Sequence, residues 1–266
     1  LVSSLHKPRT SPTHTIDFKN PKALRELTAA ILWTQFQLRL EVPLDSLVPP
    51  IPNRLGYVCW TEHLAKPNAA ESQGPSHSVH AIDIGTGASC IYPLLACKRN
   101  EDWSFLALDI DTRQIEYATE NVKRNKLEAR IAVVLNEVND RILPPELLGD
   151  REYKFCMCNP PFFKDEAQIR DARLAKAEAP SQASHASRTE MITHGGELAF
   201  LLRLLDESVC NELHQHIEWF TSLVGRREDY DLFVAELLER ELVMQCAEFR
   251  NGKTVRWGIA WTFQKQ

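Results

Sequence analysis

Apolar residues early in the chain follow a helical spacing that prolines then interrupt. From Asn20-Pro21 to about Phe36 they recur every three or four positions, and an asparagine followed by a proline suits a helix start, so we predict a helix here. Prolines between positions 43 and 52 break the pattern, which predicts a short helix, an irregular stretch and then the segment Arg54–Trp60. Residues 66–78 have the polar composition of a linker.

From residue 79 onward, apolar runs of strand length alternate with stretches of helical periodicity, which is typical of a parallel sheet with crossover helices. The turn Asn251-Gly252 predicts that the last two strands form an antiparallel hairpin. The predicted strands are 79–84, 104–109, 130–135, 153–158, 217–224, 243–249 and 254–263, and the predicted helices are 88–98, 112–126, 196–213 and 230–240. This α/β pattern resembles the Rossmann-like class I methyltransferase fold, a seven-stranded, mostly parallel sheet with an antiparallel C-terminal hairpin.

Length and composition fit one sizeable core with a small appendage. The chain has 266 residues, of which 44% are hydrophobic. We predict an N-terminal arm and helical extension at 1–78 and a class I methyltransferase domain at 79–266. The seven cysteines form no paired C-x-x-C units, so we expect neither a disulfide framework nor a metal. Neither a leader nor a membrane-length apolar run is evident, which predicts an intracellular protein of the nucleus or cytoplasm, with no membrane partner.

The net charge of −5 is unusual for a protein that binds nucleic acid, since phosphate binding favours a basic surface. An RNA partner would therefore need local basic patches. The N-terminal arm offers one, with a solvated tail as the alternative. The segment 164–193 has as many acidic as basic residues, so we expect it to fold over a substrate and position it more than to supply affinity. The candidate RNA-binding residues in these two places are Lys7, Arg9, Lys19, Arg170, Arg173 and Arg188.

A glycine turn follows the first predicted strand, where an open α/β sheet offers its ligand crevice. Glycines let the backbone turn sharply and approach a ligand closely. Cys90 stands where a pyrophosphate-binding fingerprint would have its third glycine, which disfavours NAD and FAD. A tight turn without a ligand is the alternative. The candidate cofactor-binding residues of this turn are Asp83, Gly85, Thr86, Gly87 and Ser89.

Asp109 ends the second predicted strand, about two dozen positions beyond the glycine turn. Its carboxylate can accept hydrogen bonds from both ribose hydroxyls of an adenosine ligand. The alternative is a helix N-cap, a role that Asp111 could fill equally well. Together with the glycine turn, Asp109 predicts an adenosine-containing cofactor.

The sequence Asn159-Pro160-Pro161-Phe162 follows the fourth predicted strand directly. Its prolines rigidify the turn, so that the Asn159 amide and the Pro160 carbonyl project into the same crevice. Two such acceptors would orient an exocyclic amine, whose lone pair is otherwise delocalised into its ring, and the phenylalanine could stack on the base. These residues are the candidate catalytic residues, and a purely structural turn is the alternative.

Several blocks of the sequence resemble the adenine-N6 RNA methyltransferase family of methyltransferase-like protein sixteen and the bacterial ribosomal RNA adenine-N6 methyltransferase F. The blocks are DFKNP (17–21), RLGY (54–57), IDIGTGASCIYPLL (82–95), FCMCNPPFF (155–163), GGEL (195–198) and RW (256–257). The resemblance implies S-adenosylmethionine as methyl donor, with S-adenosylhomocysteine as product. It also implies that Arg54 reaches the donor carboxylate and that Asn139 or Asp140 contacts the donor adenine. Asp109 stands where the family has a glutamate.

The activity that this resemblance implies is N6-methylation of an adenine in structured RNA, such as U6 snRNA, a messenger RNA stem-loop or ribosomal RNA. A protein glutamine-N5 methyltransferase is an alternative, although its corresponding turn commonly ends in tyrosine where this chain has Phe162. A DNA adenine-N6 methyltransferase is chemically admissible. A non-catalytic RNA-binding protein is disfavoured because both the glycine turn and the Asn-Pro-Pro-Phe turn are intact.

Overall fold

The fold is seen in a computed structural model. It describes residues 16, 20–44, 46–66, 78–138, 140–161, 164, 193, 195–210, 213–252 and 254–263. Within these residues, no helix is long and apolar enough to cross a membrane.

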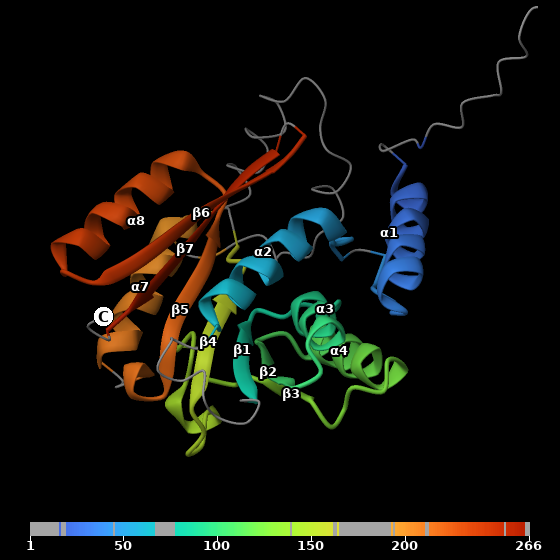
Figure 1. The fold of residues 1–266 in the computed structure, drawn as a ribbon, viewed down its shortest axis with the longest axis horizontal. Helices are drawn as coiled ribbons and strands as arrows, with labels where there is room; N and C mark the ends of the chain where they lie inside the picture. Colours follow the sequence, from blue (N-terminus) through green and yellow to red (C-terminus); the bar gives the residue numbers. More distant parts are fainter. Residues whose placement is uncertain are drawn as a thin grey trace, which may run out of the picture.

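One seven-stranded sheet organises the molecule, with the strand order β3-β2-β1-β4-β5-β7-β6. The first five strands pair in parallel, and β7 pairs antiparallel with both β5 and β6 (Figure 1). The strands are β1 (Val79–Ile84), β2 (Trp103–Asp109), β3 (Ile131–Leu135), β4 (Tyr153–Cys158), β5 (Ile217–Val224), β6 (Val243–Asn251) and β7 (Thr254–Thr262). The predicted fold class is thereby confirmed, including the antiparallel C-terminal hairpin.

Helices cover both faces of this sheet, and each face has its own apolar core (Figure 1). Side chains alternate between the two cores along each strand, so Phe155 and Met157 of β4 face one core while Cys156 and Cys158 face the other. The helices are α1 (Pro21–Phe36), α2 (Ile51–Leu64), α3 (Ile91–Arg99), α4 (Thr112–Arg124), α7 (Gly196–Cys210) and α8 (Arg227–Glu239), with 3-10 turns η1 (Pro145–Leu147) and η3 (Leu213–Gln215). Residues of α1 to α4 line the first core, and α7 and α8 line the second.

The prediction for the proline-rich stretch was wrong, because α2 is one continuous helix. Its prolines lie at the N-cap and in the first turn, where a missing N–H costs no helical hydrogen bond. The helix lies close against β7, since a Cβ built on Gly258 would meet the Trp60 ring at 2.9 Å. The lack of a side chain at Gly258 therefore allows α2 to pack this closely against β7.

The helix after the glycine turn begins later than predicted, at Ile91 rather than Ala88. Gly85, Gly87 and Cys90 all have positive φ values, and such left-handed residues interrupt a right-handed helix, so the helix starts only after Cys90. The whole segment from β1 to α3 is therefore a shaped loop that surrounds a space at the sheet edge.

Candidate active site

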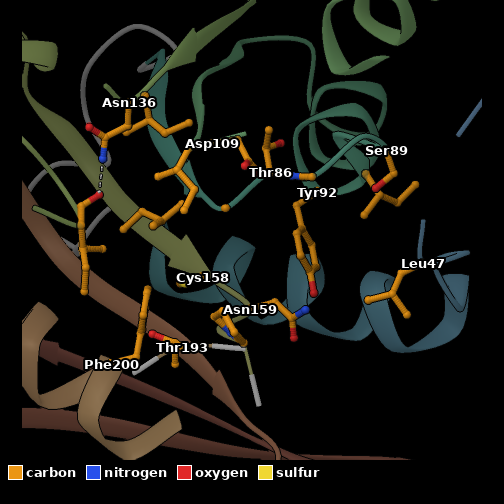
Figure 2. A pocket seen from close by; sticks show the side chains of 18 of the residues that line it. Leu47, Thr86, Ser89, Tyr92, Asp109, Asn136, Cys158, Asn159, Thr193 and Phe200 are labelled. Carbon is orange, nitrogen blue, oxygen red and sulfur yellow. Dashed lines mark hydrogen bonds between the residues drawn. The ribbon is translucent and has the colours of Figure 1, made fainter. Parts of the chain in front are cut away.

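A pocket of ≈ 260 Å³ opens at the carboxyl edge of the sheet, where β1, β2 and β4 end. Figure 2 shows Thr86, Tyr92, Asp109 and Asn159 around this pocket. The predicted site residues that the pocket brings together are Arg54, Gly85, Thr86, Gly87, Ser89, Asp109, Asn159 and Pro161. Two other described candidates, Asp83 and Pro160, are buried and do not line the pocket.

Asp109 joins β2 to the glycine turn. Its Oδ2 accepts a hydrogen bond from the Gly87 N–H at 2.8 Å, and its Oδ1 accepts one from the Asp111 N–H at 3.0 Å. Burial raises the pKa of Asp109, while the backbone donors oppose that rise. The N-cap of α4 is Asp111, whose side chain accepts from Arg113 and Gln114. Asp109 is therefore not the helix cap, and its carboxylate keeps acceptor capacity toward the pocket.

Arg54 enters the pocket from the first turn of α2. Its Nη1 donates to the Tyr92 hydroxyl at 2.6 Å, and its guanidinium lies 5.3 Å from the centre of that ring. The Nε atom of Arg54 is buried and has no hydrogen-bond partner among the described residues. Burial raises the pKa of Tyr92 to about 12, so its hydroxyl stays protonated beside the guanidinium. Arg54 thus presents a fixed positive charge to a ligand.

Asp83 lies beneath the pocket floor and is fully buried. Neither of its carboxylate oxygens meets hydrogen-bond geometry with any described residue. Burial raises the pKa of this carboxyl from 3.8 to about 7, and nearby Thr86 and Arg54 only partly offset the rise. An unpartnered buried carboxylate is costly, which indicates that a cationic or donating group of a ligand completes the site.

Asn159 leaves β4 at the pocket, on the other side from Asp109 (Figure 2). Its Oδ1 atom is buried and has no hydrogen-bond partner within the described part of the chain. The preceding residue is held from α2, since the Cys158 N–H donates to the Tyr57 hydroxyl at 3.2 Å. The side-chain carbonyl of Asn159 is therefore an acceptor that can bind a hydrogen-bond donor of a ligand in the pocket.

A loop after β3 forms a further wall, and its lining residues Asn136, Arg141 and Ile142 were not predicted as site residues. Asn136 lines the pocket, and its amide donates to the Arg141 carbonyl at 2.9 Å (Figure 2). The buried Glu207 of α7 accepts the N–H groups of Ile142 and Leu143 at 2.9 and 3.0 Å. An asparagine directly after a predicted strand was the available signal for Asn136; nothing local linked Glu207 to the loop.

Other predicted residues lie outside the described residues. They are the cofactor candidate Asn139, the catalytic candidate Phe162, and the RNA-binding candidates Lys7, Arg9, Lys19, Arg170, Arg173 and Arg188. Within the described ranges, no group of three or more side chains is placed to hold a metal ion.

The strand order and a pocket that joins a glycine turn to an acidic strand end define a class I methyltransferase. A family model described as RNA methyltransferase matches residues 7–265, and the chain belongs to this family. It is 36% identical over 254 residues to the zebrafish (Danio rerio) RNA N(6)-adenosine-methyltransferase mettl16, covering 94% of this chain and 51% of that protein. It is 35% identical over 260 residues to the Drosophila melanogaster U6 small nuclear RNA (adenine-(43)-N(6))-methyltransferase, covering 95% and 82%.

Solved structures give the same picture. The crystal structure of the hMettl16 catalytic domain in complex with MAT2A 3'UTR hairpin 1 matches with a TM-score of 0.82 at 35% identity, covering 93% of this chain and 82% of that one. The N-terminal domain of human METTL16 in complex with SAH matches with a TM-score of 0.73 at 33% identity, covering 94% and 85%. The chain spans about half the length of the vertebrate relatives that it matches.

Proposed function

We propose that this chain transfers the methyl group of S-adenosylmethionine to N6 of an adenine in structured RNA, releasing S-adenosylhomocysteine. The observation that carries the proposal is the buried Oδ1 of Asn159, which has no partner among the described residues and faces the same pocket as Asp109 and the glycine turn. The pocket thus has two adjacent binding places at one sheet edge, one for a nucleoside-type ligand and one for an amine-bearing base.

The residues present fit the methyl donor. Asp109 would accept from the ribose hydroxyls, Arg54 would pair with the carboxylate of the donor, and Asp83 lies beneath as a negative counterpart for its ammonium group. Arg54 and Asp83 carry buried polar atoms that have no partner in the described part of the chain and that such a zwitterionic ligand would satisfy. The donor, when bound, supplies an electrophilic methyl group on a sulfonium.

Asn159 would act on the acceptor. The adenine amine is a poor nucleophile because its lone pair is delocalised into the ring. An acceptor on one of its N–H groups favours the geometry in which the lone pair points toward the methyl group, and it holds the nitrogen at reacting distance. The Pro160 carbonyl, which we expected to be a second acceptor, does not line the pocket, so Asn159 is the acceptor in this proposal, and Phe162 would stack on the base. This arrangement requires no protein nucleophile and no metal.

The choice of RNA as substrate is supported by the relatives. One is named for U6 small nuclear RNA, and another was solved with an RNA hairpin. The net charge of −5 means that RNA affinity must come from local contacts, for which we propose Lys7, Arg9, Lys19, Arg170, Arg173 and Arg188. A U6 substrate would place the protein in the nucleus.

The test is incubation of the 266-residue chain with a methyl-labelled donor and either a U6 snRNA hairpin or the same hairpin with the target adenine replaced. The expected result is labelled N6-methyladenosine from the first RNA alone, identified by mass spectrometry of nucleosides. Parallel reactions with single-stranded DNA and with glutamine-containing peptides address the other acceptors. Label on peptide glutamine, or in DNA in preference to RNA, would overturn the proposal.

A further inference from the structure

Tyr57 of α2 contacts both Cys158, the last residue of β4, and Tyr92, the partner of Arg54. Its hydroxyl makes two hydrogen bonds. It accepts from the Cys158 N–H at 3.2 Å and lies 2.7 Å from the Thr221 Oγ1. Because the oxygen accepts from the Cys158 N–H, its own proton is free to go to Thr221. The side chain is completely buried, and burial keeps its pKa well above the ordinary value, so the proton stays in place.

Cys158 pairs with Ile84 of β1, and its bond to Tyr57 stands where the backbone pairing with β5 has ended. The register between β4 and β5 ends at Cys156 opposite Phe220, two residues before Cys158, and β5 continues alongside β7. A side chain from α2 therefore takes the β4 N–H that directly precedes Asn159. The last peptide of β4 is fixed in this way at the point where the chain turns into the prolines.

The ring of Tyr57 supports the other side of the pocket. It packs edge-on against Tyr92 with ring centroids 5.4 Å apart, and the Tyr92 hydroxyl receives the hydrogen bond from Arg54. The rings of Trp60 and Phe249 enclose it from behind, at 6.0 and 6.3 Å. One buried side chain thus contacts both the residue before the Asn159 turn and the aromatic partner of Arg54.

We infer that Tyr57 is a positioning residue: its hydroxyl, oriented by Thr221, fixes the Cys158 peptide and thereby sets the Asn159 amide against the methyl donor. This inference rests on the proposed function for its catalytic consequence. Loss of the hydroxyl leaves the ring packing around Arg54 intact, but it removes the acceptor that holds the turn. Small displacements at a reacting centre lower the rate of chemistry more than they lower binding.

The test compares Tyr57→Phe with Thr61→Val, which deletes another buried hydroxyl of α2, one that donates to the Val58 carbonyl and is not among the residues that line the pocket. Tyr57→Phe should lower the single-turnover rate at saturating donor and RNA about tenfold or more, with donor affinity changed by less than about twofold. Thr61→Val should keep the wild-type rate. Thr221→Val should lower the single-turnover rate in the same direction as Tyr57→Phe but by less. Thr221→Ser, which keeps the hydroxyl, should react at the wild-type rate.

Hydrogen exchange at the Cys158 amide gives a second readout that needs no RNA. Tyr57→Phe should speed this exchange, whereas Thr61→Val should not. If the wild-type chain fails to methylate RNA, the proposed function fails. The role of Tyr57 can still be tested by hydrogen exchange at the Cys158 amide and by the rate of methyl transfer to the acceptor that the chain does use. A wild-type rate in Tyr57→Phe, or an equal loss of rate in Thr61→Val, would overturn the inference even if the exchange changed.

Discussion

The Asp109 carboxylate accepts a hydrogen bond from the Gly87 N–H at 2.8 Å, and this bond ties the end of β2 to the turn that follows β1. The acidic residue thus has two tasks. It shapes the glycine turn, and it presents acceptor capacity to the pocket that the turn encloses.

We predict that Asp109→Ala lowers affinity for S-adenosylhomocysteine at least tenfold. Hydrogen bonds to a charged acceptor contribute roughly 1.5–3 kcal/mol each before water compensates, and about 1.4 kcal/mol corresponds to a factor of ten. Isothermal titration calorimetry measures the change. Asp109→Glu is the matched control, because the longer carboxylate can still reach the ribose, and it should bind within a few-fold of wild type. Equal affinity in Asp109→Ala and wild type would exclude Asp109 from the donor site.

The pKa of Asp83, which burial raises from 3.8 to about 7, predicts a pH dependence of donor affinity. Below that value the carboxyl is neutral and cannot attract the ammonium group of the ligand, so affinity should rise as the pH increases through about 7. We expect a gain of about fivefold in S-adenosylhomocysteine affinity from about pH 6 to about pH 8 in wild type, and a flat profile in Asp83→Asn. An unchanged slope in the variant would assign the pH dependence to another group.

The raised pKa of Asp83 also makes the stability of the ligand-free fold depend on pH. A carboxyl whose folded pKa is raised stabilises the fold fully only below its unfolded pKa, near 4, and that stabilisation is lost as the pH rises toward about 7. Asp83→Asn should therefore raise the melting temperature relative to wild type by an amount that grows between about pH 4 and about pH 7. Thermal unfolding across that range checks the sign, and a difference that shrinks as the pH rises would contradict it.

Glu207 connects α7 to the pocket wall, and we predict that Glu207→Gln weakens donor binding. The carboxylate accepts two neighbouring N–H groups of the loop, from Ile142 and Leu143, whereas a glutamine has one acceptor oxygen and adds donors. Affinity for S-adenosylhomocysteine should fall about threefold to tenfold, as expected for one or two weakened charge-assisted bonds. The control is Glu120→Gln, which alters an exposed pair with Lys123 and should leave affinity unchanged. Equal affinities in both variants would contradict the prediction.

The sequence predicted the parts of the site that local chemistry specifies. Strand ends fall where apolar runs stop, so Asp109 and Asn159 could be placed at one sheet edge from sequence order alone. The helical continuity of α2 could not be predicted in the same way, because prolines break a helix in its interior yet suit its first turn. Their position relative to the helix start depends on how α2 packs against β7, which is a tertiary contact.

Tyr57 and Glu207 show a second limit of the sequence. Each contacts a segment far along the chain, Cys158 in one case and Ile142 in the other. A buried tyrosine or glutamate has no local pattern that indicates such a partner. Tyr57 belongs to the RLGY block (54–57), but nothing near it in the sequence points to Cys158. Asn136 was closer to prediction, since it follows a strand end as Asp109 and Asn159 do.

We predict that Asn159→Ala abolishes methyl transfer while leaving the fold and donor binding largely intact. The Asn159 Oδ1 is buried and has no partner in the described part of the chain, so its removal breaks no bond shown in the structure. In the proposed reaction it holds an N–H of the adenine amine, and loss of one preorganised hydrogen-bonding group typically costs about 10²–10³ in turnover.

The measurement is the single-turnover rate at saturating donor with an adenine-bearing hairpin, alongside calorimetry with S-adenosylhomocysteine. The control is Asn100→Ala, which removes an amide that bonds Glu62 at the far end of α3 and should react at the wild-type rate. Donor affinity should match wild type within about twofold in both variants, which separates a loss of chemistry from a loss of binding. A near-native rate for Asn159→Ala on adenine would mean that the amine is held by other groups, and it would remove Asn159 from the mechanism.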